Sequence, residues 1–416
     1  MRRMWCHGYQ SWSESRWRTI DDAPASMSGT PSLVRQMHGP EYASGGLQSE
    51  LVTMLDDDPT VYAGDTVLLF DDGELRGARQ TYDSLDAWAC AQAGRTDAPY
   101  QVGWCSWYHY FDRVTEADIR TNLALADSWP FDVFQIDDGF QSAIGDWLTT
   151  NDKFPSSLAV LASDIAAAGF RPGLWIAPFL AAPDSEVARA HPDWFATHRS
   201  GQPLVGMVND HWGGPVHVLD TTNEEVIDHL ERLARDLVAM GFTYLKLDFT
   251  YAPGLLGTYA DPLPTLRERV RAGFEAIRRG AGDDAFLLGC GAPIGPCIGI
   301  VDGMRIGPDV APWWQPRDHF PGYAAVAPST ANALAATRAR QFMHRRLWLN
   351  DPDCVMLRTT ETDLTPDEVR QWAMAVGDSG GMVLVSDDLG LLDASARSLL
   401  DDVIARGREV DASIVS

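Results

Sequence analysis

The sequence has little positive charge and almost no lysine. Its 416 residues hold 33 Lys and Arg against 58 Asp and Glu, a formal net charge of −25, and the only lysines are Lys153 and Lys246. A chain this acidic repels a phosphate backbone, which argues against a nucleic-acid partner. Where lysine does occur, we expect a compact ammonium group to do something that arginine cannot.

Long apolar runs and metal-binding patterns are also missing. The longest apolar runs, residues 66–70 and 381–386, fall far short of the roughly 20 residues that a membrane helix needs. The N-terminus has no apolar stretch typical of a signal peptide, so we expect a cytoplasmic protein without a membrane span. The six cysteines form no Cys-x-x-Cys and the ten histidines show no metal spacing. We therefore expect free thiols, no metal and no cofactor.

From residue 101 onward, short runs of aromatic and β-branched residues alternate with helical patterns. The predicted strands occupy residues 102–107, 133–136, 171–177, 216–219, 243–248, 285–290, 304–306 and 382–386. Eight such units, with a reduced sixth helix in residues 290–303, predict an α/β fold of the (β/α)₈ TIM-barrel type over residues 96–416. Residues 1–95 are predicted to be a linker and a short β-rich remnant of an N-terminal β-sandwich.

The chemistry of such a barrel lies at the C-terminal ends of its strands. Five of the eight predicted ends carry aspartates, and tryptophans accompany them. Paired carboxylates and stacking indoles suit glycoside hydrolysis. In residues 244–248, strand alternation directs both Lys246 and Asp248 into the barrel, where the cation would keep the carboxylate ionised as a nucleophile requires. The alternative is a Lys–Asp pair that only closes the barrel core.

Several motifs occur in a fixed order along the chain. They are Gly103-Trp-Cys-Ser-Trp, Gln135-Ile-Asp-Asp-Gly-Phe-Gln, Gly145-Asp-Trp, Asp152-Lys-Phe-Pro, Gly173-Leu-Trp-Ile-Ala-Pro, His191-Pro-Asp-Trp and Tyr244-Leu-Lys-Leu-Asp. Together they resemble glycoside hydrolase family 36, the bacterial α-galactosidases, over nearly all of residues 103–388. His7-Gly-Tyr-Gln-Ser-Trp resembles a segment of that family's N-terminal β-sandwich. The resemblance implies a retaining hydrolase that removes terminal α-linked galactose from oligosaccharides through a glycosyl-aspartate.

The resemblance also assigns the two catalytic carboxyl groups. It implies that Asp248 is the nucleophile, in agreement with the strand pattern. The family's acid/base is an aspartate at the end of the seventh strand, which falls on Asp309, although the surrounding residues depart from the commoner family wording. Asp302 and Asp318 are therefore alternatives. A retaining enzyme needs about 5–5.5 Å between its two carboxyl groups, and we expect that spacing for Asp248 and Asp309.

Further residues are assigned to sugar binding by the same resemblance. Asp137 and Asp138 would hold the C4 and C6 hydroxyls of galactose, although one of them could instead cap the following loop. The other candidates are Trp175 as a pocket wall, Lys246 as a donor to the C2 or C3 hydroxyl, Cys290 beside the C2 substituent, Arg305 next to a catalytic carboxylate, and Trp313 and Trp104 as further walls. Plain core packing is the alternative for any of these side chains. For Asp351 and Asp353, turn formation is the better interpretation.

Three other functions stay open at this point. The chain could be an α-N-acetylgalactosaminidase if the small residues 289–292 leave room for an acetamido group. It could be a galactosyltransferase similar to raffinose synthases. It could also be a truncated, non-catalytic sugar-binding remnant, although both proposed catalytic carboxylates are present. An oligomer is possible, and the sequence does not define the aglycone.

Overall fold

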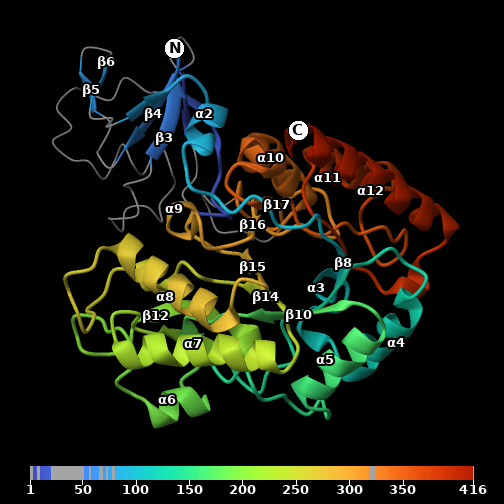
Figure 1. Ribbon diagram of the computed structural model, residues 1–416, viewed down its shortest axis with the longest axis horizontal. Helices are drawn as coiled ribbons and strands as arrows, with labels where there is room; N and C mark the ends of the chain where they lie inside the picture. Colours follow the sequence, from blue (N-terminus) through green and yellow to red (C-terminus); the bar gives the residue numbers. More distant parts are fainter. Residues whose placement is uncertain are drawn as a thin grey trace.

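The protein is described by a computed structural model for residues 3–6, 10–19, 51–55, 58–64, 69–71, 74–76, 80–317 and 324–415. Its centre is a barrel-like sheet of eight parallel strands surrounded by helices (Figure 1). Neighbouring strands follow the order of the chain: β8 (Val102–Cys105), β9 (Val133–Ile136), β10 (Arg171–Ile176), β14 (Tyr244–Leu247), β15 (Phe286–Gly289), β16 (Gly303–Arg305), β17 (Leu349–Asp351) and β18 (Val383–Val385). β18 pairs with β8, and a hydrogen bond of 2.8 Å from Met382 N to Asn350 O joins the β17 and β18 edges. The predicted TIM barrel is confirmed.

Besides the short helices α3 (Trp107–Tyr110) after β8 and α6 (Glu186–Ala190) after β10, one helix follows each strand of the barrel. These helices are α4 (Glu116–Ala126), α5 (Leu158–Ala167), α7 (Glu224–Ala239), α8 (Leu266–Ala281), the short α9 (Ile294–Cys297), α10 (Thr330–Arg340), α11 (Pro366–Ser379) and α12 (Ala394–Val415). Six of them begin at a Ser, Thr or Asn whose side chain accepts a hydrogen bond from the first turn. Such caps satisfy backbone donors that the helix itself leaves unpaired, so the starts of these helices are fixed locally. None of the described helices combines the length and apolar character needed to cross a membrane.

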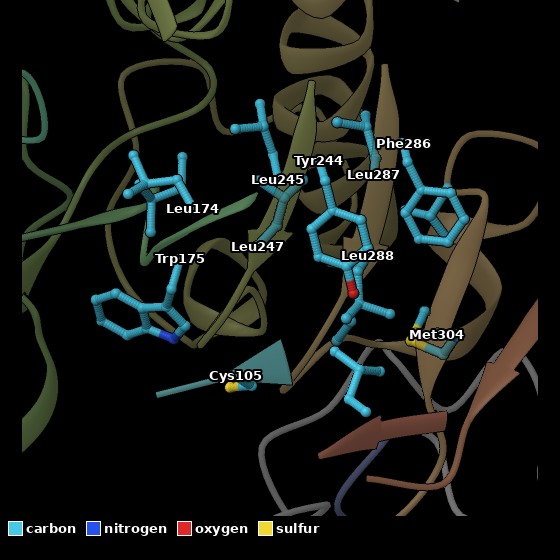
Figure 2. Close-up of a cluster of buried hydrophobic side chains, with 14 of the residues drawn as sticks. Cys105, Leu174, Trp175, Tyr244, Leu245, Leu247, Phe286, Leu287, Leu288 and Met304 are labelled. Carbon is cyan, nitrogen blue, oxygen red and sulfur yellow. The ribbon is translucent and has the colours of Figure 1, made fainter. Parts of the chain in front are cut away.

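The barrel strands are buried on both faces and carry large apolar residues. Leu245 and Leu247 lie in this core, and the rings of Tyr244 and Phe286 on paired strands stack with centroids 5.0 Å apart. Figure 2 shows this cluster around β10, β14 and β15, with Trp175 at its edge. Because strand residues alternate between two faces, the leucines of β14 leave Lys246 free to point into the barrel.

Two features of the barrel differ from the sequence prediction. Residues 216–219 were predicted as the fourth strand, but they belong to β13 (Gly214–Val218), which pairs antiparallel with β11 (Leu180–Ala181) and β12 (Val205–Asn209) in a separate sheet. The barrel instead includes β17, which ends at Asp351, a residue that the sequence analysis interpreted as part of a turn. Asp309 therefore follows the sixth barrel strand and not the seventh. β17 escaped detection because it is three residues long and ends in polar residues.

The N-terminal region forms an antiparallel sheet with strand order β2-β1-β3-β4-β7 and a separate hairpin, β5–β6. The strands are β1 (Arg3–Cys6), β2 (Arg16–Thr19), β3 (Leu51–Leu55), β4 (Asp58–Gly64), β5 (Leu69–Asp71), β6 (Glu74–Arg76) and β7 (Gln80–Tyr82), and α2 (Leu85–Cys90) follows. Figure 1 shows this sheet beside α10. Trp5 and Trp88 both pack on Phe342, with ring centroids 6.1 Å apart in each case. The N-terminal sheet is thus attached to the barrel through the segment after α10.

Candidate active site

A pocket of about 450 Å³ lies at the C-terminal ends of the barrel strands. Its size is typical of a small-molecule site. Four carboxylates and one lysine line it: Asp137, Asp138, Asp248, Asp309 and Lys246. The rest of its wall is largely aromatic and apolar, and includes Trp12, Trp107, Trp175, Met207, Trp212, Phe249, Tyr251, Leu255 and Val326. The pocket thus combines a few converging charges with large flat side chains.

Asp248 follows β14 directly and is held from both sides. Its Oδ2 accepts a hydrogen bond of 2.9 Å from Trp175 Nε1, and its Oδ1 accepts one of 2.8 Å from Phe249 N. Phe249 adopts a positive φ of 52°, so the chain turns immediately after the carboxylate. Burial raises the pKa of Asp248, while the charge of Lys246 and the Trp175 hydrogen bond oppose that rise. These two groups favour the ionised form, which is the nucleophilic one.

Lys246 bonds Asp137 instead of Asp248. Its Nζ lies 2.9 Å from Asp137 Oδ2, and both side chains are almost fully buried. Gln135 Nε2 donates to the same carboxylate oxygen, and Asp137 N is fixed by a 2.9 Å hydrogen bond to Ser106 Oγ. A buried ion pair keeps its geometry only when further hydrogen bonds complete it, as they do here. The pair presents one cation and one anion to the pocket in fixed positions.

Asp138 is held by a tryptophan from outside the barrel. Trp212 Nε1 donates to Asp138 Oδ2 at 2.8 Å, and Gln141 Nε2 donates to Oδ1 at 2.6 Å. Trp212 belongs to η4 (Asp210–Trp212), the turn between β12 and β13. Burial and the nearby charges of other aspartates raise the pKa of Asp138 to about 6, against the effect of these two hydrogen bonds. Neither Asp137 nor Asp138 caps a helix, and both line the pocket.

Asp309 is the more exposed of the two proposed catalytic carboxylates. Its side chain is 34% exposed, and its Oδ1 accepts a 2.8 Å hydrogen bond from Nη2 of Arg305, the last residue of β16. Arg305 is buried behind Asp309 and does not itself line the pocket. Asp248 and Asp309 therefore line the same pocket from the ends of two strands. The Asp248 carboxylate is buried, whereas the Asp309 carboxylate is partly exposed to solvent.

Arg305 also connects Asp309 to a second carboxylate. The same Nη2 donates to Asp353 Oδ2 and, at 3.0 Å, to Tyr108 Oη. Asp353 lies two residues after β17 and adopts a positive φ of 97°, a conformation that costs free energy in any residue with a side chain. It was interpreted as a turn residue in the sequence. Although it does sit in a turn, its carboxylate is buried and directed at Arg305.

Three further candidates are placed away from the pocket wall. Trp104 stacks on Phe134 in the barrel core, with centroids 4.3 Å apart, and donates to Asp387 O at 2.8 Å. Trp313 donates to Pro328 O at 3.1 Å, and neither tryptophan lines the pocket. Cys290 is fully buried, and burial raises the pKa of its thiol, which also hydrogen-bonds Asp248. Trp175 does line the pocket.

The alternatives for the acid/base residue fall elsewhere. Asp302 precedes β16, at the opposite end of that strand from Asp309. Its carboxylate accepts hydrogen bonds from Arg95 Nε and Leu287 N, each at 2.8 Å, and it also pairs with Arg278. Asp302 is thus a structural ion-pair partner outside the pocket. Asp318 lies outside the described residues.

The N-terminal segment closes one side of the pocket with an indole. Trp12 packs edge-on against Phe249, with centroids 5.0 Å apart, and lies against Gly291. A Cβ atom at Gly291 would come within 2.8 Å of the Trp12 ring, and the φ of this glycine is +52°. Glycine is therefore required there both by its own conformation and by the ring next to it. Ser11 N bonds Ala292 O at 2.9 Å and fixes the segment beside this turn.

Arg340 anchors the same N-terminal segment. Its guanidinium is fully buried at the end of α10. It donates to the backbone carbonyls of Gln10, Ser11 and Ser13 at 2.6–2.9 Å and to Ser15 Oγ at 3.1 Å. One side chain therefore ties residues 10–15 to the barrel and places Trp12 over the pocket.

The sequence prediction missed two tryptophans of the pocket, Trp12 and Trp212, and the role of Asp353 behind the pocket. Trp12 stands in the motif that begins at His7, which could have marked it as a candidate. Trp212 and Asp353 carry no local signal, because their roles depend on contacts with residues far away in the sequence. Within the described parts of the chain, no group of three or more His, Cys, Asp or Glu residues could hold a metal ion.

Comparison with known proteins gives one consistent family. The family model described as Melibiase matches residues 67–254. The curated α-galactosidase AgaA of Geobacillus stearothermophilus is 28% identical over 216 residues, which cover 50% of this chain and 28% of that protein. The chain therefore matches little more than a quarter of the length of this relative.

Solved structures extend the likeness to nearly the whole chain. TtGalA, an α-galactosidase from Thermus thermophilus in complex with p-nitrophenyl α-D-galactopyranoside, is 31% identical with a TM-score of 0.76. The match covers 97% of this chain and 86% of that one. The family 36 α-galactosidase AgaA from Geobacillus stearothermophilus shares the fold, with a TM-score of 0.61 at 14% identity over 98% of this chain and 61% of that chain.

Proposed function

This chain belongs to glycoside hydrolase family 36, the α-galactosidases, and on that premise we propose that it hydrolyses terminal α-linked galactose from oligosaccharides. The observation that carries the proposal is a single pocket lined by Asp248, Asp309 and the charged groups of Asp137, Asp138 and Lys246. Glycoside hydrolysis needs one carboxylate to attack or activate water and one to protonate the leaving group. We assign these two steps to Asp248 and Asp309, and Asp137, Asp138 and Lys246 supply further polar groups for the sugar.

Asp248 is the proposed nucleophile. The two hydrogen bonds from Trp175 and Phe249 N hold its carboxylate in place, and the nearby charge of Lys246 favours its ionised form. A nucleophile aligned before the substrate arrives loses little entropy in reaching the transition state. Asp248 attacks the anomeric carbon and forms a covalent glycosyl-aspartate as the glycosidic bond breaks.

Asp309 is the proposed acid/base. Protonated, it donates to the glycosidic oxygen while Asp248 attacks; ionised, it then takes a proton from the water that releases the sugar with its α configuration kept. A carboxyl group that cycles between two protonation states needs contact with solvent, and Asp309 is one-third exposed. This retaining route predicts a separation of about 5–5.5 Å between the two carboxyl groups.

Recognition of the galactose ring is assigned to the aspartates that follow β9. Asp137 and Asp138 would accept hydrogen bonds from the C4 and C6 hydroxyls, and Lys246 would donate to the hydroxyl at C2 or C3. Glucose lacks the axial C4 hydroxyl, and a buried acceptor left without its donor is costly. Trp175 and Trp212 supply apolar faces for the ring.

We propose galactose rather than N-acetylgalactosamine as the sugar that this pocket takes. Residues 289–292 were considered as space for an acetamido group, with Cys290 next to the C2 substituent. The open side of Gly291 is filled by the Trp12 ring, and a Cβ atom at Gly289 would come within 2.9 Å of the end of Met304. Both glycines therefore make room for protein side chains rather than for a larger substrate.

The test is hydrolysis of p-nitrophenyl α-galactoside by the purified chain and its Asp248→Asn variant. We expect the variant to lose roughly 1000-fold or more in kcat, as for other nucleophile deletions. Asp228→Asn makes the same chemical change at an exposed residue of α7, away from the pocket, and should leave the rate unchanged. The α-glucoside and α-N-acetylgalactosaminide serve as substrate controls, and NMR of the first-formed sugar reports retention. A folded chain that cleaves no α-galactoside would refute the proposed function.

A further inference from the structure

Among the described residues, Asp309 has one cationic hydrogen-bond donor, Arg305, and shares it with a second carboxylate. Arg305 Nη2 contacts Asp309 Oδ1 and Asp353 Oδ2 at the same time, so Asp309, Arg305 and Asp353 form one charge cluster. The cluster has one positive charge for two carboxyl groups and is electrically balanced only when one of the two carries a proton. Arg305 and Asp353 are buried, which makes an unbalanced charge costly there.

The hydrogen bonds indicate which carboxyl group stays ionised. Asp353 accepts from Arg305, Tyr108 Oη and Val310 N on Oδ2, and from Cys354 N on Oδ1 at 2.7 Å. A proton on Asp353 would turn one of its carboxylate oxygens into a donor, and that oxygen could no longer accept all the hydrogen bonds that these four donors now make. Within the part of the chain that the structure describes, the Asp309 carboxylate accepts one side-chain hydrogen bond, from Arg305, and it borders the pocket. Protonation is therefore less disruptive on Asp309 than on Asp353.

We propose that Asp353 is a positioning residue, which engages Arg305 so that Asp309 can hold the proton that it donates to the leaving group. This inference rests on the proposed function of the same site. Without Asp353, Arg305 would pair with Asp309 alone and stabilise its ionised form, which cannot act as an acid. The positive φ of Asp353 supports this role, because the structure maintains an unfavourable backbone conformation that directs the carboxylate at Arg305.

The surroundings of the charge cluster contain other titratable groups. Burial raises the pKa of Asp353 to about 7, while Arg305 acts in the opposite direction. The hydrogen bond from Tyr108 acts in the same direction as Arg305, so the donors described above favour the ionised form of Asp353 against its burial. The other titratable groups facing the cluster are Tyr108 from α3 (Trp107–Tyr110), Asp248 after β14, Cys290 after β15, and Asp351 and Cys354 on either side of Asp353.

The test compares the pH dependence of kcat/KM for the wild type and Asp353→Asn with two substrates. Methyl α-galactoside has a poor leaving group that needs the acid, whereas p-nitrophenyl α-galactoside depends on it much less. For the methyl substrate, we expect the alkaline limb of kcat/KM to lie about 1 pH unit lower in the variant. At pH values above the limb, kcat/KM of the variant should then be about tenfold lower than that of the wild type. For the p-nitrophenyl substrate, we expect rates within about twofold of the wild type.

The matched control is Asp351→Asn, the same change two residues away. Asp351 is paired with Arg305 across β16 and β17 and bonds the backbone of Asp353, but among the described residues its carboxylate makes no hydrogen bond or ion pair with the guanidinium, so the alkaline limb of this variant should move less than that of Asp353→Asn. The positioning role would be overturned if the alkaline limb of Asp353→Asn coincided with that of the wild type. It would also be overturned if kcat/KM fell by the same factor at every pH with both substrates. If Asp353→Asn does not fold, Tyr108→Phe removes one donor to Asp353 and should shift the limb less, in the same direction.

Titration of the Asp309 carboxyl group tests the inference without an assay of activity. Aspartate labelled with ¹³C at its side-chain carboxyl reports the midpoint for Asp309, assigned by difference from Asp309→Asn. We expect a lower midpoint in Asp353→Asn than in the wild type, and an unchanged midpoint would refute the inference. An inactive wild type would refute the proposed function alone, because this titration still measures the charge cluster.

Discussion

Replacing Arg340 with methionine should release the N-terminal segment from the pocket while the barrel stays folded. The guanidinium makes four hydrogen bonds to residues 10–15, and hydrogen bonds to charged groups contribute about 1.5–3 kcal/mol each. Removal of a buried charge offsets part of that sum, and the values are not additive. We expect a net loss of about 3 kcal/mol in the docking of the segment, which corresponds to an opening equilibrium more than 100-fold larger.

Hydrogen exchange measured by mass spectrometry is the direct assay for this opening. The Ser11 and Ser13 amides are bonded to Ala292 O and Gln10 O in the docked segment, and a peptide that contains them should exchange more than 100-fold faster in Arg340→Met. Peptides from the barrel strands should exchange at the wild-type rate. The KM for an α-galactoside should rise as well, because Trp12 no longer covers the pocket.

Arg338→Met provides the matched control. Arg338 lies on the same helix, α10, but is exposed, so this variant should keep wild-type exchange in residues 10–15. Unchanged exchange of that peptide in a folded Arg340→Met protein would show that the guanidinium does not hold the segment. Equally fast exchange in both variants would place the cause in the helix rather than in the four hydrogen bonds.

Two further predictions concern pH. Hydrogen bonds from His344 and Arg345 hold the pKa of Asp411 at about 2, below its ordinary value of 3.8 and against the effect of burial. The Asp411 carboxylate therefore stabilises the fold fully at about pH 5 and above, and this contribution is lost as the pH falls toward 2. Thermal unfolding of Asp411→Asn should depend less on pH in this range, and an identical dependence would contradict the assignment. Trp212→Phe removes a hydrogen bond that favours the ionised form of Asp138, so the pKa of Asp138 should rise above about 6. The acidic limb of kcat/KM should then move to higher pH. An acidic limb that stays in place would show that Asp138 binds substrate in either form.

The parts of the molecule that sequence could predict are those set by local patterns. The run that ends at Asp248 alternates polar and apolar residues, so its position at a strand end follows from the strand period. The starts of α4, α5 and α7 depend on a capping residue and the helical pattern behind it, and both are local features of the sequence. For such elements the necessary information lies within a few residues.

The parts that sequence could not predict depend on distant contacts. β17 is a strand only because β16 lies beside it, and β13 has the pattern of a strand but pairs outside the barrel. Trp12 reaches the pocket because Arg340, more than 300 residues further along the chain, binds the carbonyl groups next to it. No periodicity in a single segment encodes such a relation.

The join between β18 and β8 has a consequence for synthesis of the protein on the ribosome. β8 is the first of the eight barrel strands to be translated, but one of its two neighbours, β18, is the last of them: Val383 of β18 pairs with Val102 of β8. Until then one edge of β8 has no strand to pair with, and an unpaired edge can associate with another chain. The barrel can be closed only after nearly all of it has been translated, so the time spent on the ribosome is also the time during which the nascent chain is most open to aggregation.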